Sequence, residues 1–370
     1  MKIVFLCKRR YMNKDVIMDR YARLYEMPRK LAQLGHQVEC FSFSYQSVSD
    51  SGTWPHQVDN GRLVWHSRFG KGLLPVRLMR HLLELDAFLR DFQPDVVIAA
   101  SDIPNVVLGR VMAHRHGARF VADLYDNFES FPQSKIPGFC SVFRWAVRRA
   151  DVVTCVSPTL MGLVKDSYRV TGKVLFLPST IDDAVFTRLD KTLAREKLGL
   201  PGGAKLIGTA GALYREKGIA DLYGAWDCLK YDEDLHLVLA GPQNGSISIP
   251  DGERVHYLGS IDHKQVATLF NALDVGVMCI PDDRFGQYCF PQKAYEMLAC
   301  GLPVVSSKVG AMAALLEETP NTLYEFGDSV ALAGSIASQL LEKQLPDISI
   351  KDWTEVIAEA ELEIRKLLES

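Results

Sequence analysis

Short, continuously apolar runs recur along the whole chain, and stretches with helical periodicity separate them. The runs read KIVFLC, QVECFSFS, LVWHSR, DVVIAA, RFVADLY, DVVTCVS and KVLFLPS in the first half, and KLIGTAG, LHLVLAG, VHYLGS, DVGVMCI, LPVVSS and NTLYEF in the second. Continuous rather than alternating apolarity is typical of strands that are buried on both faces, and such strands form parallel sheets covered by helices. The two series therefore predict an α/β chain with two doubly wound, Rossmann-like domains.

A more polar segment at residues 182–204 separates the two series and is the predicted linker region. We expect residues 1–182 to form an N-terminal domain and residues 183–352 a C-terminal domain. Ligands of open α/β sheets bind outside the carboxyl ends of the strands. Two such domains facing each other would form a cleft that holds a ligand between them.

The composition bounds the class of protein and its compartment. The 370 residues are 48% hydrophobic, which is enough for two domains with sizeable cores. No stretch approaches the roughly 20 apolar residues that span a bilayer, and the N-terminal MKIVFLCKRR enters a strand at once, without the pattern of a signal peptide. The eight cysteines include no C-x-x-C pair, and Cys7, Cys40 and Cys279 lie inside apolar runs. Such cysteines are usually reduced, which favours a cytoplasmic protein.

The net charge of −3 is the sum of two halves of the chain that have opposite net charges. Residues 1–182 contain 25 Lys and Arg against 17 Asp and Glu, a charge of +8, and residues 183–370 contain the remaining 17 against 28, a charge of −11. This asymmetry favours an anionic partner for the first half, such as a membrane surface or a nucleic acid. A chance difference between two solvated surfaces is the alternative.

The stretch FGQYCFPQKAYEMLACGLPVVSS, residues 285–307, contains a predicted helix between Pro291 and Gly301. The polar residues Gln292, Lys293 and Glu296 form one stripe in its N-terminal half. The free N–H groups and the positive dipole end of a helix bind anions, and Lys293 would add a full charge. Glu296 could accept hydrogen bonds from a sugar diol, so a phosphate beside a ribose would satisfy both residues. The alternative is a solvated Lys–Glu pair.

Two further segments follow strands and contain cations. In GTAGALYREKGIADLYGAW, residues 208–226, a strand ends at Gly211, and Arg215 and Lys217 then precede an amphipathic run, an arrangement that suits a diphosphate. A plain strand–turn–helix connection with solvated charges is the alternative. Residues 8–10, Lys-Arg-Arg, directly follow the first strand, so they point toward the proposed cleft unless they form a solvated loop.

Together these features resemble the GT-B glycosyltransferases of the family 4 type. GALYREKG resembles that family's strand–loop–Lys-Gly segment, and YCFPQKAYEMLACGLPVV resembles its E-x7-E helix followed by A-x-G-x-P-V-V. LAQLGHQVECFS, ADVVTCVSPTL and LPSTIDDAVF resemble segments of its N-terminal domain. The resemblance implies that Lys217 contacts the donor diphosphate and that Glu296 binds the nucleotide ribose. It also implies that the last helix, residues 353–370 with Trp353, packs back on the N-terminal domain.

The chain departs from the family pattern at several positions. Tyr288 replaces the first glutamate of E-x7-E and Pro291 the glycine that follows, which resembles the P-x-K-x-x-E variant of some bacterial surface-polysaccharide transferases. In that variant the lysine, here Lys293, joins the diphosphate site. Ala212 replaces the family arginine, so Arg215 or Lys293 would substitute for it. The family histidine after RFVADLY is replaced by a tyrosine, which leaves Asp126 as the polar candidate.

The resemblance leads to a predicted donor site in the C-terminal domain, without a metal or another cofactor. Its residues are Gly211, Arg215, Lys217, Tyr288, Cys289, Phe290, Gln292, Lys293 and Glu296. Residues 288–290 would line the sugar pocket, partly through backbone N–H groups. The resemblance favours retention of the anomeric configuration, and in an inverting enzyme Asp126 would be the catalytic base.

Residues 138–150, GFCSVFRWAVRRA, place apolar side chains on one helical face and Arg144, Trp145 and Arg148 on the other. A Trp among arginines suits a membrane interface or an anionic headgroup, and Arg9 and Arg10 belong to the same predicted acceptor or membrane surface. The alternative is a core helix whose arginines stack on Trp145. Residues 67–83 also interleave basic and apolar side chains. No aromatic–basic module typical of nucleic-acid binding is present.

These observations predict a glycosyltransferase that moves a sugar from a nucleoside-diphosphate donor to the hydroxyl of a glycan or lipid-linked acceptor. The expected context is synthesis of a cell-surface polysaccharide or glycolipid, in the cytoplasm or at the inner face of the membrane. Two alternatives remain open. One is a non-catalytic GT-B module that binds a nucleotide sugar, and the other is a nucleotide-sugar 2-epimerase.

Overall fold

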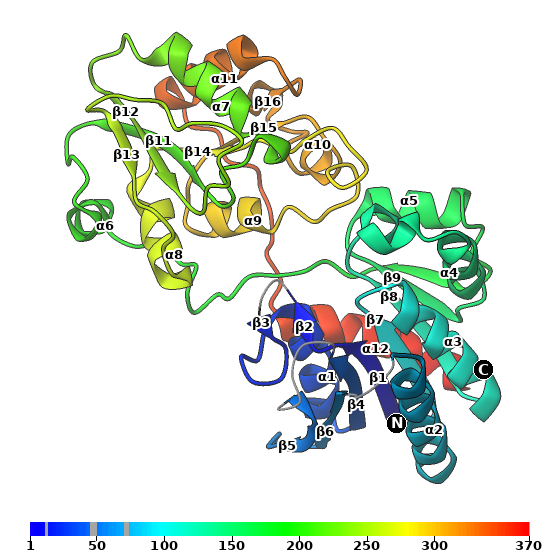
Figure 1. Ribbon diagram of the computed structural model, residues 1–370. Coiled ribbons are helices and arrows are strands. Elements are labelled where there is room, and N and C mark those ends of the chain that lie inside the picture. The colour runs from blue at the N-terminus through cyan, green and yellow to red at the C-terminus, as the bar shows by residue number, and fades with distance from the viewer. Residues whose placement is uncertain (12–13, 45–49, 70–73, 370) are drawn as a thin grey trace. The chain divides into compact units, whose positions relative to one another are not determined.

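The computed structural model describes residues 1–11, 14–44, 50–69 and 74–369 and divides the chain into two compact units. Unit 1 comprises Met1–Ser179 and Trp353–Ser370, and unit 2 comprises Thr180–Asp352. The sequence places the first boundary after residue 182. Figure 1 shows that each unit contains a central sheet with helices packed around it.

Unit 1 is built on a sheet with the strand order β10-β9-β8-β7-β1-β4-β6-β5 (Figure 1). Its strands are β1 (Lys2–Lys8), β4 (Gln37–Ser44), β5 (Gly52–His56), β6 (Arg62–Phe69), β7 (Val96–Ala100), β8 (Arg119–Leu124), β9 (Val152–Cys155) and β10 (Lys173–Phe176), and β2 (Arg10–Tyr11) and β3 (Lys14–Asp15) form a separate ribbon. Its helices are α1 (Ala22–Gln33), α2 (Leu74–Phe92), α3 (Ile103–His116), η2 (Phe128–Ser130), η3 (Pro132–Lys135), α4 (Phe139–Arg148), α5 (Pro158–Asp166) and α12 (Trp353–Glu369).

Unit 2 is built on a parallel sheet with the order β13-β12-β11-β14-β15-β16. Its strands are β11 (Lys205–Ala210), β12 (Leu235–Ala240), β13 (Val255–Tyr257), β14 (Val275–Met278), β15 (Val304–Ser307) and β16 (Leu323–Tyr324). Its helices are α6 (Lys191–Leu198), η4 (Arg215–Lys217), α7 (Ile219–Leu229), α8 (His263–Ala272), α9 (Gln292–Ala299), α10 (Ala311–Leu315), η5 (Pro320–Thr322) and α11 (Ser329–Leu341).

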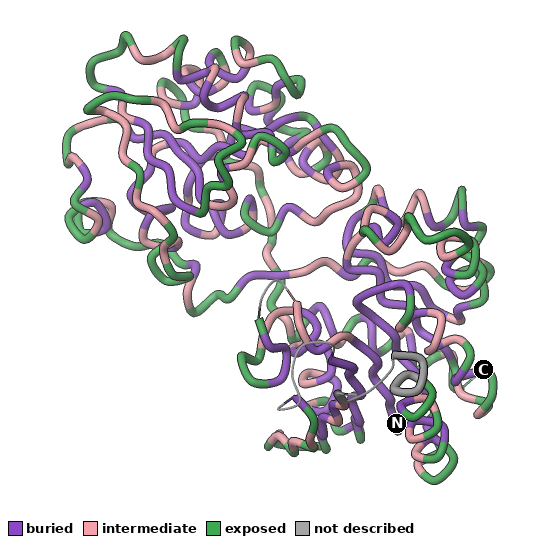
Figure 2. The backbone as a smooth tube through the Cα atoms, viewed as in Figure 1, coloured by how far each residue is buried: buried purple, intermediate pink, exposed green. Residues whose placement is uncertain are grey.

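Each predicted apolar run contributes a strand, so the prediction of two doubly wound α/β domains is confirmed. Figure 2 shows buried residues concentrated along the central strands of both units, as expected for sheets covered on both faces. In unit 1 the fully buried side chains include Phe5, Trp65 and Phe120, one from each of three strands.

Strand β5 is missing from the sequence prediction. It pairs antiparallel with β6 at the edge of the sheet, and its residues alternate between exposed and half-buried. An edge strand of this kind has no continuous apolar run, and it tolerates Pro55, which cannot donate a ladder hydrogen bond. Strand β5 therefore lacks the sequence pattern of a buried strand because it lies at the edge of the sheet.

The prediction that residues 182–204 form a linker region is wrong for most of that segment. Helix α6 lies within it, and Phe186, Ala194 and Leu200 belong to the hydrophobic core of unit 2. Gly199 ends the helix at a φ of +65°. The segment therefore belongs to the folded body of unit 2.

Helix α12 packs on helix α1 within unit 1. The buried His36 side chain forms a 2.7 Å hydrogen bond through Nε2 to Glu361 Oε1, and Lys30 Nζ donates to Thr354 Oγ1 at 2.7 Å. The last helix is thus attached to the unit that contains the N-terminus. No helix of the described residues is both long enough and apolar enough to cross a membrane.

Candidate functional site

The strand order of unit 2 reverses between β11 and β14, because the chain runs from β11 to β12 on one side and from β14 to β15 on the other. Ligands of open α/β sheets bind at such a switch point, outside the carboxyl ends of the strands. Gly211 directly follows β11, and helix α9 follows β14 through the segment 279–291. The predicted donor site therefore occupies the position in unit 2 that is most typical of a ligand site.

Two glycines shape the backbone at this point. Gly211 has a φ of +141°, and a Cβ on this residue would lie 2.1 Å from Lys293 Nζ. Gly241 has a φ of +133°, and its Cβ would lie 1.8 Å from the carbonyl oxygen of Gly211. Both residues have a conformation that favours glycine, and the Lys293 ammonium lies directly against the backbone of the turn after β11.

Lys293 lies on the first turn of α9, and two charged neighbours affect the pKa of its ammonium group. Protein atoms crowd the ammonium and lower its pKa, and the positive charge of Lys217 lowers the pKa further, while Glu296 opposes both effects. Solvent still reaches the side chain. Both observations hold because one side of the ammonium lies against the backbone of the turn after β11, whereas its other side is open to solvent.

Lys217 is placed by an aromatic ring that the sequence prediction does not include. Its Nζ lies 4.3 Å from the centroid of the Phe285 ring, in the segment before α9. Gly218, with a φ of +80°, ends the short helix η4 directly after the lysine and begins α7. Within the described residues, neither Lys217 nor Lys293 has a carboxylate within 4.0 Å. Two neighbouring cations without a carboxylate partner would suit an anion such as a diphosphate.

Glu296 lies one turn further along α9 and is only 5% exposed. Gln292 Nε2 donates to its Oε1 at 3.0 Å, which confirms the predicted polar stripe, and His263 Nε2 lies 3.9 Å from the same oxygen. Burial raises the pKa of Glu296, while Gln292, His263 and Lys293 act in the opposite direction. No group of the described chain donates a hydrogen bond to Oε2, so this oxygen is available to a ligand hydroxyl.

Two of the backbone N–H groups that were predicted to line the sugar pocket have acceptors within their own turn. The backbone N–H groups of Tyr288 and Cys289 both donate to the carbonyl oxygen of Phe285, at 3.2 and 3.0 Å. Both groups stabilise this turn, and a contribution of the residues 288–290 backbone to a sugar pocket stays a prediction. The Phe290 ring stacks on Tyr295 at 4.8 Å, and the three side chains are half-buried. Their proximity to the sugar stays a prediction.

Arg215 is oriented toward a different loop. Its backbone N–H donates to Ser246 Oγ at 3.0 Å, and its Nε donates to the carbonyl oxygen of Ser246 at 3.3 Å. No contact in the described part of the structure joins its guanidinium to Lys217 or Lys293. Which of Arg215 and Lys293 substitutes for the missing family arginine stays a prediction.

In unit 1, Asp126 follows β8 and accepts a hydrogen bond from the backbone N–H of Asn127 at 2.7 Å. It is half-buried and lies close enough to Lys8 and Tyr11 to affect the pKa of both side chains. The structure thus places Asp126 in a polar cluster at the carboxyl edge of the first sheet. Its catalytic role stays a prediction.

The prediction that Arg9 belongs to an acceptor or membrane surface is wrong. Its side chain is buried, pairs with Asp15 at 2.9 Å and lies 4.5 Å from the Trp54 ring. Arg10 is also paired, since its Nη2 lies 2.8 Å from Asp50 Oδ1. Arg9 therefore fixes the loop after β1, and Arg10 offers only a partly exposed, neutralised charge.

Helix α4 has the two faces that its sequence predicts. Phe143, Ala146 and Val147 are buried, while Trp145 and Arg148 are exposed on the opposite face. Arg144 on the helix and Arg149, the residue directly after it, have partners in the same unit. Arg144 forms a bidentate pair with Glu129 at 2.5 and 2.7 Å, and the Arg149 guanidinium lies 5.5 Å from the Trp145 ring. Of the second basic stretch, residues 70–73 lie outside the described part of the chain.

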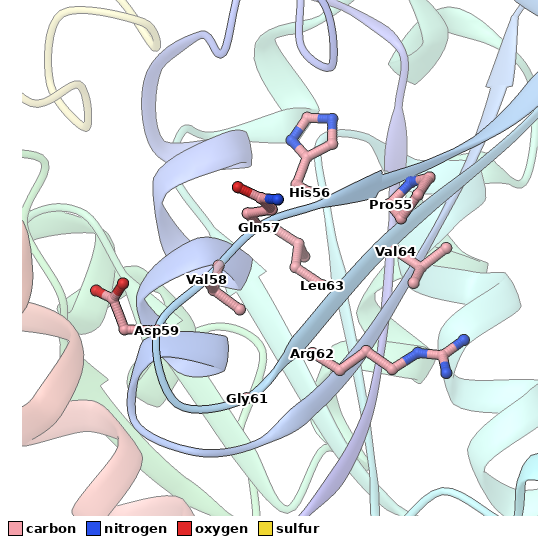
Figure 3. Close-up of a pocket in the computed structure, with 9 residues that line it drawn as sticks. All are labelled: Pro55, His56, Gln57, Val58, Asp59, Gly61, Arg62, Leu63 and Val64. Atoms are coloured by element: carbon pink, nitrogen blue, oxygen red, sulfur yellow. The ribbon is translucent and has the colours of Figure 1, made fainter.

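A hollow of about 810 Å³ lies in unit 1 at the hairpin of β5 and β6 (Figure 3). Arg62 begins β6, so the hollow lies at the amino end of this parallel strand, away from the carboxyl edge where ligands bind. The side chains of His56, Asp59 and Arg62 point in different directions (Figure 3). Among the described residues, no group of three or more His, Cys, Asp or Glu side chains could hold a metal ion.

Comparison with known proteins shows the family. Residues 22–185 match the model of Glycosyltransferase Family 4, and residues 204–342 match the model of Glycosyl transferases group 1. The chain belongs to the family 4 type of GT-B glycosyltransferases. The order of the two matches agrees with the two doubly wound units, and the second match contains the whole cluster around Lys217, Lys293 and Glu296.

Two curated relatives illustrate the diversity within this GT-B family. The chain is 23% identical to the N-acetyl-alpha-D-glucosaminyl L-malate synthase of Bacillus anthracis, over 56% of this chain and 55% of that protein. It is 26% identical to TuaC of Bacillus subtilis, which is named for teichuronic acid biosynthesis, over 67% of this chain and 61% of that protein. The matches thus span between half and two thirds of each relative.

Two solved structures show the same fold over the whole chain. The sucrose-phosphate synthase of Thermosynechococcus elongatus has a TM-score of 0.74 at 17% identity, and both chains are covered completely. The Anabaena protein HepE in complex with UDP has a TM-score of 0.68 at 16% identity, again with complete coverage of both chains. At this level of identity the two structures establish the GT-B fold of the chain.

Sequence reasoning missed two side chains of the site. Phe285 lies under Lys217, and His263 lies beside Glu296 at the start of α8. Neither belongs to a motif, and each is separated by many residues from the side chain that it contacts. The sequence contains only weak indications of these two contacts. Phe285 is a single aromatic residue after an acidic turn, and His263 lies in the first turn of α8, after the capping residue Asp262.

Proposed function

We propose that the protein transfers a sugar from a nucleoside-diphosphate sugar to an acceptor hydroxyl. The observation that supports this proposal best is that Lys293 lies close to both Lys217 and the buried Glu296, at the switch point of the second sheet. The cations suit two phosphoryl groups, and the carboxylate suits the diol of the adjoining ribose. A nucleoside diphosphate satisfies all three side chains at once.

The chemistry follows from where charge develops. As the glycosidic bond breaks, negative charge accumulates on the leaving diphosphate, and fixed cations stabilise that charge more strongly than they stabilise the intact donor. Lys217 and Lys293 would supply this stabilisation without a metal ion. Retention of configuration needs no dedicated base on the protein, whereas an inverting reaction would use Asp126.

The proposed acceptor is a glycan or a lipid-linked glycan, in the synthesis of a cell-surface polysaccharide or glycolipid. The relative named for teichuronic acid biosynthesis supports this context. The relative that forms an L-malate glycoside shows a smaller acceptor, which carries carboxylates. The HepE complex with UDP supports a nucleoside diphosphate as the leaving group.

A panel of UDP-, GDP-, ADP- and CMP-sugars tests the proposal. One nucleotide class is expected to raise the melting temperature, because binding to the native state stabilises it by mass action. Replacement of Glu296 by Ala should weaken the binding free energy of that donor by about 1.5–3 kcal/mol, since charge-assisted hydrogen bonds are lost, and calorimetry measures this change. Lys264→Ala, an exposed lysine on α8, is the control and should leave the affinity unchanged.

Product analysis separates the remaining alternatives. Sugar transfer to an acceptor supports the proposal, epimerisation of the donor without acceptor indicates a 2-epimerase, and binding without turnover indicates a non-catalytic module. Failure of every nucleotide sugar to stabilise the protein, or full donor affinity in Glu296→Ala, would contradict the donor site as assigned.

Peripheral contact with an anionic membrane is a further part of the proposal, and exposed residues of α4 would make it. Trp145 and Arg148 give this face an aromatic ring and a positive charge outside the ion pair of Arg144. The protein is expected to float with anionic liposomes at low salt, and Arg148→Glu should reduce the bound fraction. Lys197→Glu, on the exposed surface of α6, should not. Absence of flotation at low salt would remove this contact from the proposal.

A further inference from the structure

The first sheet has a switch point of its own. The chain runs from β1 to β4 on one side, while β7 and β8 lie on the other, so the order reverses between β1 and β7. Lys8 is the last residue of β1, and Ser101 directly follows β7. The backbone N–H of Lys8 donates to Ser101 Oγ at 2.8 Å, which ties the two strand ends together.

Ser101 has an unusual backbone conformation for its residue type. It is buried and has a φ of +84°, in the left-handed region that residues other than glycine rarely adopt. Its carbonyl oxygen accepts a hydrogen bond from the Tyr125 hydroxyl at 3.0 Å, in addition to the bond that Lys8 makes to its side chain. Strained conformations that the surroundings hold in this way cluster at ligand sites.

The Lys8 ammonium lies among three aromatic rings, which we name the aromatic box. Its Nζ lies 5.0 Å from the ring centroid of Tyr11, 5.5 Å from that of Phe131 and 6.0 Å from that of Tyr125. Aromatic rings attract a cation through their faces, but they do not accept its hydrogen bonds as an oxygen does. The box therefore positions the ammonium and leaves its three N–H donors to another partner.

Lys8 differs in this respect from the two cations that follow it. Arg9 pairs with Asp15 and Arg10 with Asp50, whereas Lys8 Nζ has no hydrogen bond and no ion pair among the residues that the structure describes. The nearest carboxylates are engaged locally. Asp102 accepts two hydrogen bonds from Asn105, at 3.0 and 2.8 Å, and Asp126 accepts one from the backbone of Asn127.

We propose that Lys8 binds a negatively charged substituent of the acceptor, a carboxylate or a phosphate, at the carboxyl edge of the first sheet. This assignment rests on the proposed function, since it names the chemical class of the acceptor. A half-buried ammonium without an oxygen partner gains most from an anion, because the bonds formed are charge-assisted and the partial desolvation of the cation has already taken place. A neutral hydroxyl would gain less from the same position.

The experiment compares three related sugars on the full-length protein. D-glucuronate, D-glucose 6-phosphate and D-glucose are titrated by calorimetry in the presence of a saturating nucleoside diphosphate, which keeps the second-unit site occupied. We expect at least one of the two anionic sugars to bind about tenfold more tightly than D-glucose, or better. Lys8→Met should abolish that preference, and Lys8→Arg should retain part of it. Lys135→Met, an exposed lysine of the same unit, is the matched control.

The two anionic sugars also identify the group that is recognised, since the preference that Lys8→Met abolishes belongs to either the carboxylate or the phosphate. An undiminished preference in Lys8→Met would overturn the proposal, as would a wild-type protein that binds neither anionic sugar more tightly than D-glucose. Nucleoside-diphosphate affinity, measured in the same variants, should stay unchanged. If the wild type binds no nucleoside diphosphate, the proposed function fails, whatever the outcome at Lys8.

Discussion

Replacement of Lys293 by Met is expected to lower kcat/KM for the nucleotide sugar about 100-fold or more, the usual effect of removing one group that stabilises developing charge. The Lys293 ammonium lies against the Gly211 turn and beside the charge of Lys217. Methionine keeps an unbranched apolar stem of nearly the same length and removes the ammonium group. Most of the loss should appear in kcat, because the charge on the leaving diphosphate increases toward the transition state.

Steady-state kinetics with a fixed acceptor measures this effect, and the matched control is Lys264→Met on the exposed surface of α8. Lys217→Met should give a loss of similar size, because both ammonium groups would serve the same diphosphate in the proposed site. The two losses should not add, since neighbouring groups of one site act together. A Lys293→Met variant with the kcat/KM of the wild type would place the diphosphate elsewhere.

The architecture of the molecule was largely predictable from sequence, for a local reason. A strand buried on both faces is apolar at every position, so runs such as residues 96–100 and 304–307 are visible without knowledge of their neighbours. Helix α9 was equally visible, because Pro291 and Gly301 mark its two ends and the i,i+4 spacing of Gln292 and Glu296 defines one face.

The partners of charged side chains were not predictable in the same way. Residues 8–10 form one basic tripeptide in the sequence, yet the three side chains have three different environments. Arg10 pairs with Asp50, 40 residues along the chain, and Arg9 is buried against Trp54. Lys8 alone lies in an aromatic box. Sequence pattern locates a strand end, whereas only the folded chain shows which cation is neutralised there.

The same limit applies to the candidate donor site. The sequence identified Lys217, Lys293 and Glu296 because they occupy family positions on continuous segments. Phe285 contacts Lys217 only because β11 and β14 are neighbours in the sheet, although 68 residues separate the two side chains. The backbone N–H groups of residues 288 and 289 bond within their own turn, a detail that depends on loop geometry alone.

A buried ion pair connects the fold of unit 1 to the edge of the sheet that contains Asp126. Arg23 on α1 donates through Nε to Asp123 Oδ2 at 3.0 Å, and both side chains are almost fully buried. Thr154 Oγ1 donates to the same carboxylate at 2.6 Å, and Arg23 also donates to the carbonyl oxygen of Leu177. The pair thus joins α1, β8, β9 and the segment after β10. Asp123 itself lies three residues before Asp126 in the chain.

Replacement of Arg23 by Met should lower the free energy of unfolding of unit 1 by about 3–5 kcal/mol, because a buried carboxylate would be left without its cation. Hydrogen exchange of the β8 and β9 amides measures this change within the unit. The double variant Arg23→Met/Asp123→Leu should recover most of the loss, since an apolar pair of similar volume avoids the unpaired charge. Arg119→Met, which breaks the exposed 3.1 Å pair with Asp151, should cost only about 0–1 kcal/mol. Two results would contradict this explanation: a loss in Arg23→Met as small as that in Arg119→Met, or a double variant no more stable than Arg23→Met. In either case the buried ion pair would not be what stabilises this edge of the sheet, and the position of Asp126 would depend on other contacts.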